Sequence, residues 1–208
     1  MTKKILFIQP TDTPDWIPDL QAYLDSGKDA DTQVDVVCLE RGPKHLEYHY
    51  YEALIAGDVL HLVKKAEKDG YDGAMIACFD DPCVRESKEI CNRLVVTGLA
   101  ESSMHLAATL GDRFSIINAR RKCEGSFREN VYRYGVIDKL ASIRNLELGV
   151  HDFQSKPELT EQRMEEEIKA AIYEDGAEVI CLGCTMMFGF YKKMQEKYGV
   201  PVIDAMLV

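Results

Sequence analysis

The ten residues DGYDGAMIAC at positions 69–78 have a second copy, DGAEVICLGC, at positions 175–184. In both copies an Asp-Gly pair precedes an apolar run, and a cysteine stands eight residues after the glycine. An Asp-Gly pair is typical of a turn, and a short apolar run after a turn is typical of a strand buried in a parallel sheet. The pattern therefore predicts two central parallel strands, with Cys78 at the carboxyl end of one and Cys184 at the carboxyl end of the other.

Strand and helix patterns alternate on both sides of these two stretches. Further strands are predicted at 4–8, 34–39, 94–97, 114–117, 146–148 and 200–203, and helices at 15–24, 46–69 with a break near Gly57, 82–93, 101–110, 124–134, 161–174 and up to 198. This order predicts an α/β protein with two pseudo-symmetric Rossmann-like lobes, each a four-stranded parallel sheet flanked by helices.

The repeat also indicates how the chain is divided. We expect a first lobe from residues 1–97 together with the C-terminal end, about 200–208, and a second lobe from residues 98–199. No linker rich in Gly, Ser or Pro separates them, so the lobes are expected to pack closely. Ligands of open parallel sheets bind at the carboxyl ends of the strands. The sequence thus predicts an active site between the lobes, with one thiol from each.

Composition limits the classes of partner. The chain has 208 residues, 46% of them hydrophobic, and a net charge of −10, with a pI near 5.0. Nucleic acids and anionic membranes attract clustered Lys and Arg, so neither is an expected partner, and a small-molecule substrate is. No apolar run reaches 18 residues and no signal peptide is recognisable, which favours a soluble, cytoplasmic protein. Seven cysteines at irregular spacing do not predict a disulfide framework.

Two facing thiols suit proton transfer at carbon. A base on one face removes a proton and an acid on the other face returns one, which requires one thiolate and one thiol. Backbone N–H groups after each cysteine, near Phe79 and Asp80 and near Thr185 and Met186, are candidate donors to an enolate oxygen. This chemistry requires no cofactor and no metal.

Four segments carry a resemblance to a known family. They are ACFDDP at 77–82, VTGLAESSMHLAATLGDRFSII at 96–117, RYGVIDKLASIR at 133–144 and EDGAEVICLGCTMM at 174–187. Together they resemble the Asp/Glu/hydantoin racemase superfamily, and most closely its hydantoin and allantoin racemase branch. The resemblance implies two pseudo-symmetric lobes, a homo-oligomer in the range from dimer to hexamer, and cofactor-independent racemisation with Cys78 and Cys184 as acid and base.

Residues next to the cysteines indicate the substrate. Phe79 stands where amino-acid racemases of the superfamily usually carry a small polar residue, which favours a cyclic ureide, a 5-substituted hydantoin or allantoin. The first loop, with Gln9 and Thr11, differs from the Asn-Pro-Asn usual in relatives, and Cys83 replaces a frequent glycine. The predicted substrate-binding residues are Phe79, Thr185, Gln9, Thr11, Asn118, Asp80 and Glu101.

Other interpretations stay open at this point. The chain can catalyse a different reaction of the superfamily, as an aspartate/glutamate-type racemase or as a cis-trans isomerase with a nucleophilic cysteine. From another class, it can be a non-catalytic small-molecule binding protein. Cys181 and Cys184 fit a CxxC redox or metal pattern, and His45, His49 and Glu52 fit one face of a metal-binding helix, although no further ligands are evident for either.

Overall fold

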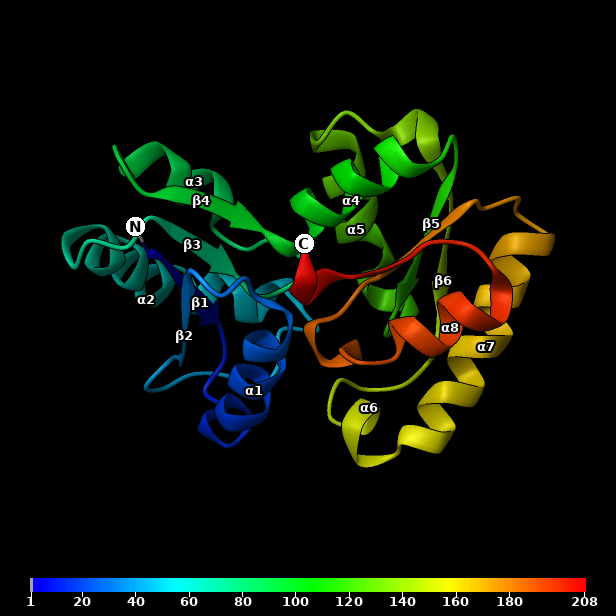
Figure 1. Cartoon of the computed structure of the whole chain (residues 1–208), viewed down its shortest axis with the longest axis horizontal. Coiled ribbons are helices and arrows are strands. Elements are labelled where there is room, and N and C mark those ends of the chain that lie inside the picture. The colour runs from blue at the N-terminus through cyan, green and yellow to red at the C-terminus, as the bar shows by residue number, and fades with distance from the viewer. Residues whose placement is uncertain (1) are drawn as a thin grey trace. The chain divides into compact units, whose positions relative to one another are not determined.

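The computed structural model describes residues 2–208, which form two compact units (Figure 1). The first lobe contains the residues up to Leu99 together with Leu207, and the second lobe contains Ala100–Met206 and Val208. The predicted change of lobe after residue 97 is close to this boundary. Among residues 2–208, no helix combines the length and apolar character needed to cross a bilayer.

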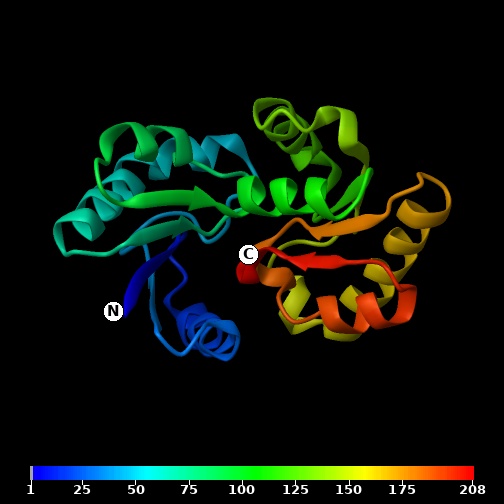
Figure 2. The same cartoon turned by 45° about the horizontal axis from the view of Figure 1, so that its top comes forward.

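The first lobe is a parallel sheet in the order β2-β1-β3-β4. Its elements are β1 (Lys3–Gln9), α1 (Ile17–Gly27), β2 (Thr32–Cys38), α2 (His49–Lys68), β3 (Gly73–Ile76), α3 (Val84–Ile90) and β4 (Val95–Gly98). Figure 2 shows α1 on one face of the sheet and α2 with α3 on the other. Because side chains alternate along a strand, Leu6 and Ile8 of β1 point to the α2 face and join its core.

The second lobe repeats this topology in the order β6-β5-β7-β8. Its elements are α4 (Leu99–Leu110), which begins at the boundary, β5 (Phe114–Asn118), α5 (Glu124–Arg133), β6 (Leu140–Asn145), α6 (Asp152–Ser155), α7 (Pro157–Tyr173), β7 (Val179–Leu182), α8 (Tyr191–Tyr198) and β8 (Val202–Asp204). Every residue of β5 and β7 is buried, as expected for central strands covered on both faces. The predicted fold class of two four-stranded parallel α/β lobes is confirmed.

Helix α2 runs without the break that was predicted near Gly57. A glycine inside a helix costs about 1 kcal/mol relative to alanine. Here Ile55, Val59, Val63 and Ala66 form a buried stripe along the helix, and their burial outweighs that cost. Helix α3 is shorter than the predicted 82–93, since Cys83 takes the left-handed conformation and the helix starts only at Val84.

Two predictions for the second half are wrong. The strand beside β5 is Leu140–Asn145 and not 146–148, because Glu147 has φ of 54° and cannot continue an extended strand. The half-exposed polar residues of this edge strand also hide it from a search for apolar runs. The C-terminal segment from about 200 was assigned to the first lobe, but β8 hydrogen-bonds to β7 and therefore completes the second sheet.

Candidate active site

Cys78 leaves the first sheet at its carboxyl end. Strand β3 ends at Ile76, and the next residue, Ala77, still donates its N–H to the Ile8 carbonyl at 2.8 Å. The Cys78 N–H then turns back to the Ile76 carbonyl at 3.0 Å. This places a half-buried thiol directly beyond the end of a central strand, where ligands of parallel α/β sheets bind.

The Cys78 thiol contacts a carboxylate. Its Sγ donates to Asp80 Oδ2 at 3.7 Å, within the range of a sulfur hydrogen bond. A carboxylate accepts but does not donate, so the Cys78 thiol is the donor of this hydrogen bond. Asp80, predicted as a substrate-binding residue, therefore lies against the thiol itself.

Cys184 leaves the second sheet in the same way. Gly183 donates its N–H to the Ile117 carbonyl at 2.8 Å, and Cys184 follows in extended conformation with φ of −158°. Its carbonyl accepts from Met187 N at 3.1 Å and opens a short 3-10 turn, Thr185–Met187. The Cys184 side chain is half-buried, like that of Cys78.

The register of the two sheets makes the cysteines equivalent. Ile8 pairs with Ile76 in the first sheet, and Ile117 pairs with Leu182 in the second. In each lobe the cysteine is the second residue beyond the third strand, after a residue bonded to the first strand. The repeat seen in the sequence is therefore a repeat of backbone hydrogen bonds.

Gln9 and Thr11 form a buried chain of polar side chains after β1. Gln9 Nε2 donates to Thr11 Oγ1 at 3.0 Å, and the hydroxyls of Thr11 and Thr13 lie 2.8 Å apart. Gln9 is 4% exposed, and its Oε1 has no hydrogen-bond partner among the described residues. A buried carbonyl oxygen without a donor is costly, which makes this atom a candidate acceptor for a ligand N–H.

Asn118 occupies the Gln9 position of the second lobe, as the predicted pseudo-symmetry requires. Its Nδ2 donates to the Arg120 carbonyl at 2.7 Å and to Asn145 Oδ1 at 2.9 Å, and its Oδ1 accepts from Ala119 N at 2.7 Å. These bonds tie the end of β5 to its own loop and to β6. The geometry thus indicates a structural part for Asn118, in contrast to Gln9.

The sequence did not point to two buried carboxylates next to the strand ends. Asp81 is 2% exposed with φ of 52°, and its Oδ1 lies 2.2 Å from where a Cβ on Gly98, the last residue of β4, would stand. In the second lobe, Asp204 at the end of β8 accepts from Gly189 N and Met206 N, both at 3.0 Å. In the sequence, the only indication of these two carboxylates is that Asp204 ends the otherwise apolar run 202–204.

The remaining predicted residues lie close to these features. Phe79 is 1% exposed, so its side chain is packed among other residues. Thr185 is buried in the turn after Cys184 and accepts from Phe188 N at 3.3 Å. Glu101 lies in the first turn of α4, where a carboxylate interacts favourably with the helix dipole.

Burial affects two of the other thiols, Cys181 and Cys83. Burial raises the pKa of Cys181, whose Sγ contacts the Ser103 carbonyl at 3.8 Å inside the second lobe. Burial, with a smaller effect from Glu86, raises the pKa of Cys83 to about 11. A reactive thiol requires an accessible thiolate, so these positions do not favour the CxxC redox interpretation.

The two histidines considered as metal ligands each lie beside a carboxylate. His45 Nδ1 lies 3.3 Å from Glu47, and His49 Nδ1 lies 3.1 Å from Glu52. Within the described part of the chain, no three His, Cys, Asp or Glu side chains group together as metal ligands would.

The comparisons with known proteins identify the class of protein to which this α/β fold belongs. The model of the family described as Asp/Glu/Hydantoin racemase matches residues 5–208. A hydantoin racemase of Pseudomonas sp. (strain NS671) is 35% identical over 204 residues, covering 98% of this chain and 82% of the relative. One of Paenarthrobacter aurescens is 35% identical over 174 residues, covering 83% of this chain and 73% of the relative.

A comparison with solved structures gives the same family. The structure of the allantoin racemase from Klebsiella pneumoniae superimposes with a TM-score of 0.92 at 27% identity, covering 99% of this chain and 83% of that one. The chain is therefore an isomerase, a racemase. It belongs to the Asp/Glu/hydantoin racemase family.

Proposed function

We propose that this racemase inverts the C5 stereocentre of a cyclic ureide, a 5-substituted hydantoin or allantoin, with Cys78 and Cys184 as acid and base. The observation that carries the proposal is the equivalent backbone position of the two half-buried thiols, one per lobe. The mechanism requires both thiols to reach one substrate from opposite faces. No cofactor takes part in the proposed steps.

The contact between Cys78 and Asp80 suggests the starting protonation states. Cys78 begins as the thiol because it donates to a carboxylate, and Cys184 then begins as the thiolate. Cys184 removes the C5 proton, and the electrons of the C5–H bond move to the adjacent carbonyl oxygen as an enolate. Cys78 then gives its proton to the opposite face of C5, and the roles are exchanged for the other enantiomer.

Polar groups near the cysteines support a ureide ring as substrate. Such a ring carries N–H donors beside its carbonyl acceptors, and Gln9 Oε1 is a buried acceptor to which none of residues 2–208 donates. Thr11 holds the Gln9 amide in place, so both belong to the proposed binding site. The backbone at Phe79, Asp80 and Thr185 is proposed to stabilise the enolate oxygen. The names of the similar proteins, hydantoin racemase and allantoin racemase, point to the same substrate class.

Proton exchange in deuterium oxide tests the proposal. With 5-substituted hydantoins and allantoin, wild type should lose optical rotation while deuterium enters at C5, followed by circular dichroism and NMR. Cys78→Ala and Cys184→Ala should each slow racemisation by about 10³-fold or more, because each removes a group that transfers the proton. Cys91→Ala is the matched control, since Cys91 is also half-buried but ends α3, and it should keep wild-type rates.

Three outcomes would contradict the proposal. Racemisation that persists in either cysteine variant would show that the pair is not the acid and base. Exchange on aspartate or glutamate but on no ureide would instead establish an amino-acid racemase. Binding of a ureide without exchange, by a folded wild type, would favour the non-catalytic binding protein.

We also propose that the chain forms a homo-oligomer, between dimer and hexamer. The first lobe exposes large apolar side chains at Tyr50, Leu54 and Val95, which a subunit interface would cover. Light scattering coupled to size exclusion should give a mass at least twice that of the chain. A monomer at micromolar concentration would overturn this proposal without affecting the reaction.

A further inference from the structure

The first lobe has a hollow away from Cys78. It measures about 670 Å³ and is lined by His61, Lys64, Lys65, Glu67, Lys68, Asn92 and Arg93. The last turns of α2 lead into the amino end of β3, and Asn92 and Arg93 precede the amino end of β4. The hollow therefore lies at the opposite end of the strands from Cys78. We call it the basic hollow.

Its cations come from one face of a helix. His61, Lys64, Lys65 and Lys68 follow the i, i+3, i+4, i+7 spacing that places residues on one side of α2. Arg93 faces them from the segment before β4. Four side chains that are cationic at neutral pH thus line one hollow of a protein whose net charge is −10.

Two of these cations are neutralised. Lys64 Nζ pairs with Glu67 Oε2 at 2.7 Å, while Glu67 Oε1 accepts the N–H groups of Asn92 at 2.6 Å and Arg93 at 2.9 Å. The hydrogen bond from Lys64, with these backbone bonds, lowers the pKa of Glu67 to about 2. Lys65 pairs with Asp69. Glu67 thus fixes the walls of the hollow.

The other two cations have no such partner. No carboxylate of residues 2–208 forms an ion pair with the Lys68 or Arg93 side chain, and both side chains are exposed. The C-terminal dipole of α2 opposes an anion here with about half a unit charge, less than the two full charges of Lys68 and Arg93. The hollow therefore keeps a net attraction for a multivalent anion.

The second lobe shows that the fold does not require these cations. The buried stripe Ile55, Val59, Val63 and Ala66 of α2 corresponds to Thr160, Met164, Ile168 and Ala171 of α7. In this alignment the four α2 positions of the hollow become Glu166, Lys169, Ala170 and Tyr173, and by strand register Asn92 and Arg93 become Tyr198 and Gly199. The second lobe thus has one cation, Lys169, at the positions where the first lobe has four, although both helices pack on their sheets in the same way.

We propose that the basic hollow binds a small multivalent anion carrying phosphate or carboxylate groups. Its volume is within the range of small-molecule sites, about 300–1,000 Å³. Lys68 and Arg93 bind the charged groups, and Asn92 supplies an amide donor. The site is independent of the thiols and of the substrate that they act on.

Calorimetric titration of the full chain with tripolyphosphate and with citrate at low ionic strength tests this proposal, since salt screens exposed charges. We expect one site for at least one of these probes, and the better probe identifies the phosphate or carboxylate class. The double variant Lys68→Glu/Arg93→Glu should weaken binding by at least about tenfold, because attraction becomes repulsion. Circular dichroism and racemase activity should remain at wild-type levels, which shows that the variant is folded.

The matched control carries the same change of net charge elsewhere. Lys169 and Lys192 are exposed residues of the second lobe, outside the hollow, so Lys169→Glu/Lys192→Glu should leave the affinity within about twofold of wild type. Equal weakening in both double variants would show a nonspecific effect of net charge and overturn the proposal. The absence of binding for both probes to wild type would overturn it as well.

Discussion

The two lobes hold their cysteines by the same backbone bonds and surround them with different side chains. Beyond β3, the Cys78 thiol meets the carboxylate of Asp80. Beyond β7, the position equivalent to Asp80 is Met186, which has no charge. The two lobes thus share the backbone that places each thiol and differ in the side chains around it. In the mechanism proposed above, this difference would make Cys78 the thiol and Cys184 the thiolate at the start of a turnover.

A buried carboxylate near the fourth strand shows the same contrast. In the first lobe it is Asp81, which reaches from the loop after Cys78 to Gly98 of β4. In the second lobe it is Asp204 of β8, which reaches to Gly189 in the loop after Cys184. Gly98 and Asp204 hold the same register position, since they pair with Ile76 and Leu182. The loop therefore supplies the carboxylate in the first lobe, and the fourth strand supplies it in the second lobe.

Gly98→Ala should break this link in the first lobe alone. The new Cβ would stand 2.2 Å from Asp81 Oδ1 and 2.3 Å from its Cγ, and the buried carboxylate has little room to move. We expect a loss of about 3 kcal/mol in the free energy of unfolding, at the upper end of overpacking effects, measured by urea denaturation. The added change Asp81→Gly should recover part of the loss, since it removes the clash and suits the positive φ of residue 81. Equal losses in the single Gly98 variant and the double variant would show that Asp81 is not the obstacle.

Gly183→Ala probes the tighter of the two strand ends. Its Cβ would lie 2.8 Å from the Ile117 carbonyl oxygen and 2.9 Å from Phe127, so backbone would have to shift next to Cys184. A loss of about 2 kcal/mol is expected. The equivalent residue of the first lobe is already alanine, Ala77, so its replacement by glycine should cost only about 0.5–1 kcal/mol. Similar values for the two changes would mean that the lobes are equally tight here.

Asp80→Asn should remove the difference between the thiols. The Asn amide oxygen can still accept from the Cys78 thiol, but the negative charge that disfavours the Cys78 thiolate is removed. We expect kcat for ureide racemisation to fall about tenfold, equivalent to about 1.4 kcal/mol. In the pH–rate profile, the fall in rate at high pH should begin at a lower pH than in wild type. Asp80→Glu retains the charge and should restore part of the rate. A pH–rate profile unchanged by Asp80→Asn would show that the carboxylate does not influence the reacting thiol.

The sequence predicted the parts of this fold that depend on apolar runs and on the repeat. The matched cysteines, the central strands and the correspondence of Gln9 with Asn118 are confirmed because each is fixed by strand register. It failed where one residue interrupts a pattern, as at Glu147, where a positive φ ends the extended segment. It also failed for the C-terminal strand, since sequence spacing does not show which sheet a strand joins.

For the site, the sequence identified positions but not interactions. Gln9 and Asn118 look alike in sequence, yet only the hydrogen bonds show that one amide is saturated and the other retains an unbonded oxygen. In the sequence Asp81 is typical of a polar turn, and its burial against Gly98 becomes clear only in the structure. Whether a polar side chain is buried or hydrogen-bonded depends on contacts between residues distant in sequence, and these contacts cannot be recognised from a single sequence.

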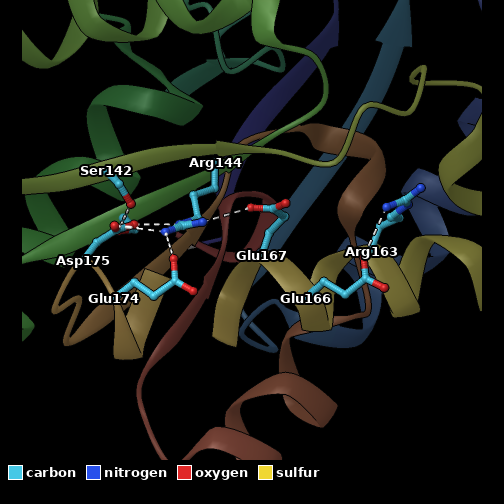
Figure 3. Close-up of polar contacts among 8 residues, drawn as sticks. Ser142, Arg144, Arg163, Glu166, Glu167, Glu174 and Asp175 are labelled. Atoms are coloured by element: carbon cyan, nitrogen blue, oxygen red, sulfur yellow. Dashed lines mark hydrogen bonds and ion pairs between the residues drawn. The ribbon is translucent and has the colours of Figure 1, made fainter. Parts of the chain in front are cut away.

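The turn that precedes each third strand gives the smallest expected difference between the lobes. In the first lobe Tyr71 donates to Asp35 of β2 at 2.7 Å. In the second lobe Ser142 of β6, at the register position of Asp35, donates to Asp175 (Figure 3). Asp175 also accepts two bonds from Arg144, at 2.6 and 3.0 Å. The second turn is thus bound to its edge strand by an ion pair, and the first turn is bound to its edge strand by a neutral hydroxyl donor.

Arg144→Met should destabilise the protein by about 1 kcal/mol at pH 7, with a strong pH dependence. The hydrogen bond from Arg144 holds the pKa of Asp175 below its ordinary value of 3.8. A lowered carboxyl pKa stabilises the fold above that ordinary value, and the effect is lost as pH falls through the native pKa. The difference from wild type in urea denaturation should therefore be full at pH 7 and shrink below about pH 4.

Arg163→Met is the matched control, because the Arg163 side chain pairs with Glu166 on the exposed helix face (Figure 3). This change should cost less than about 0.5 kcal/mol at any pH. Equal, pH-independent effects of the two changes would show that the charge on Arg144 does not hold the turn.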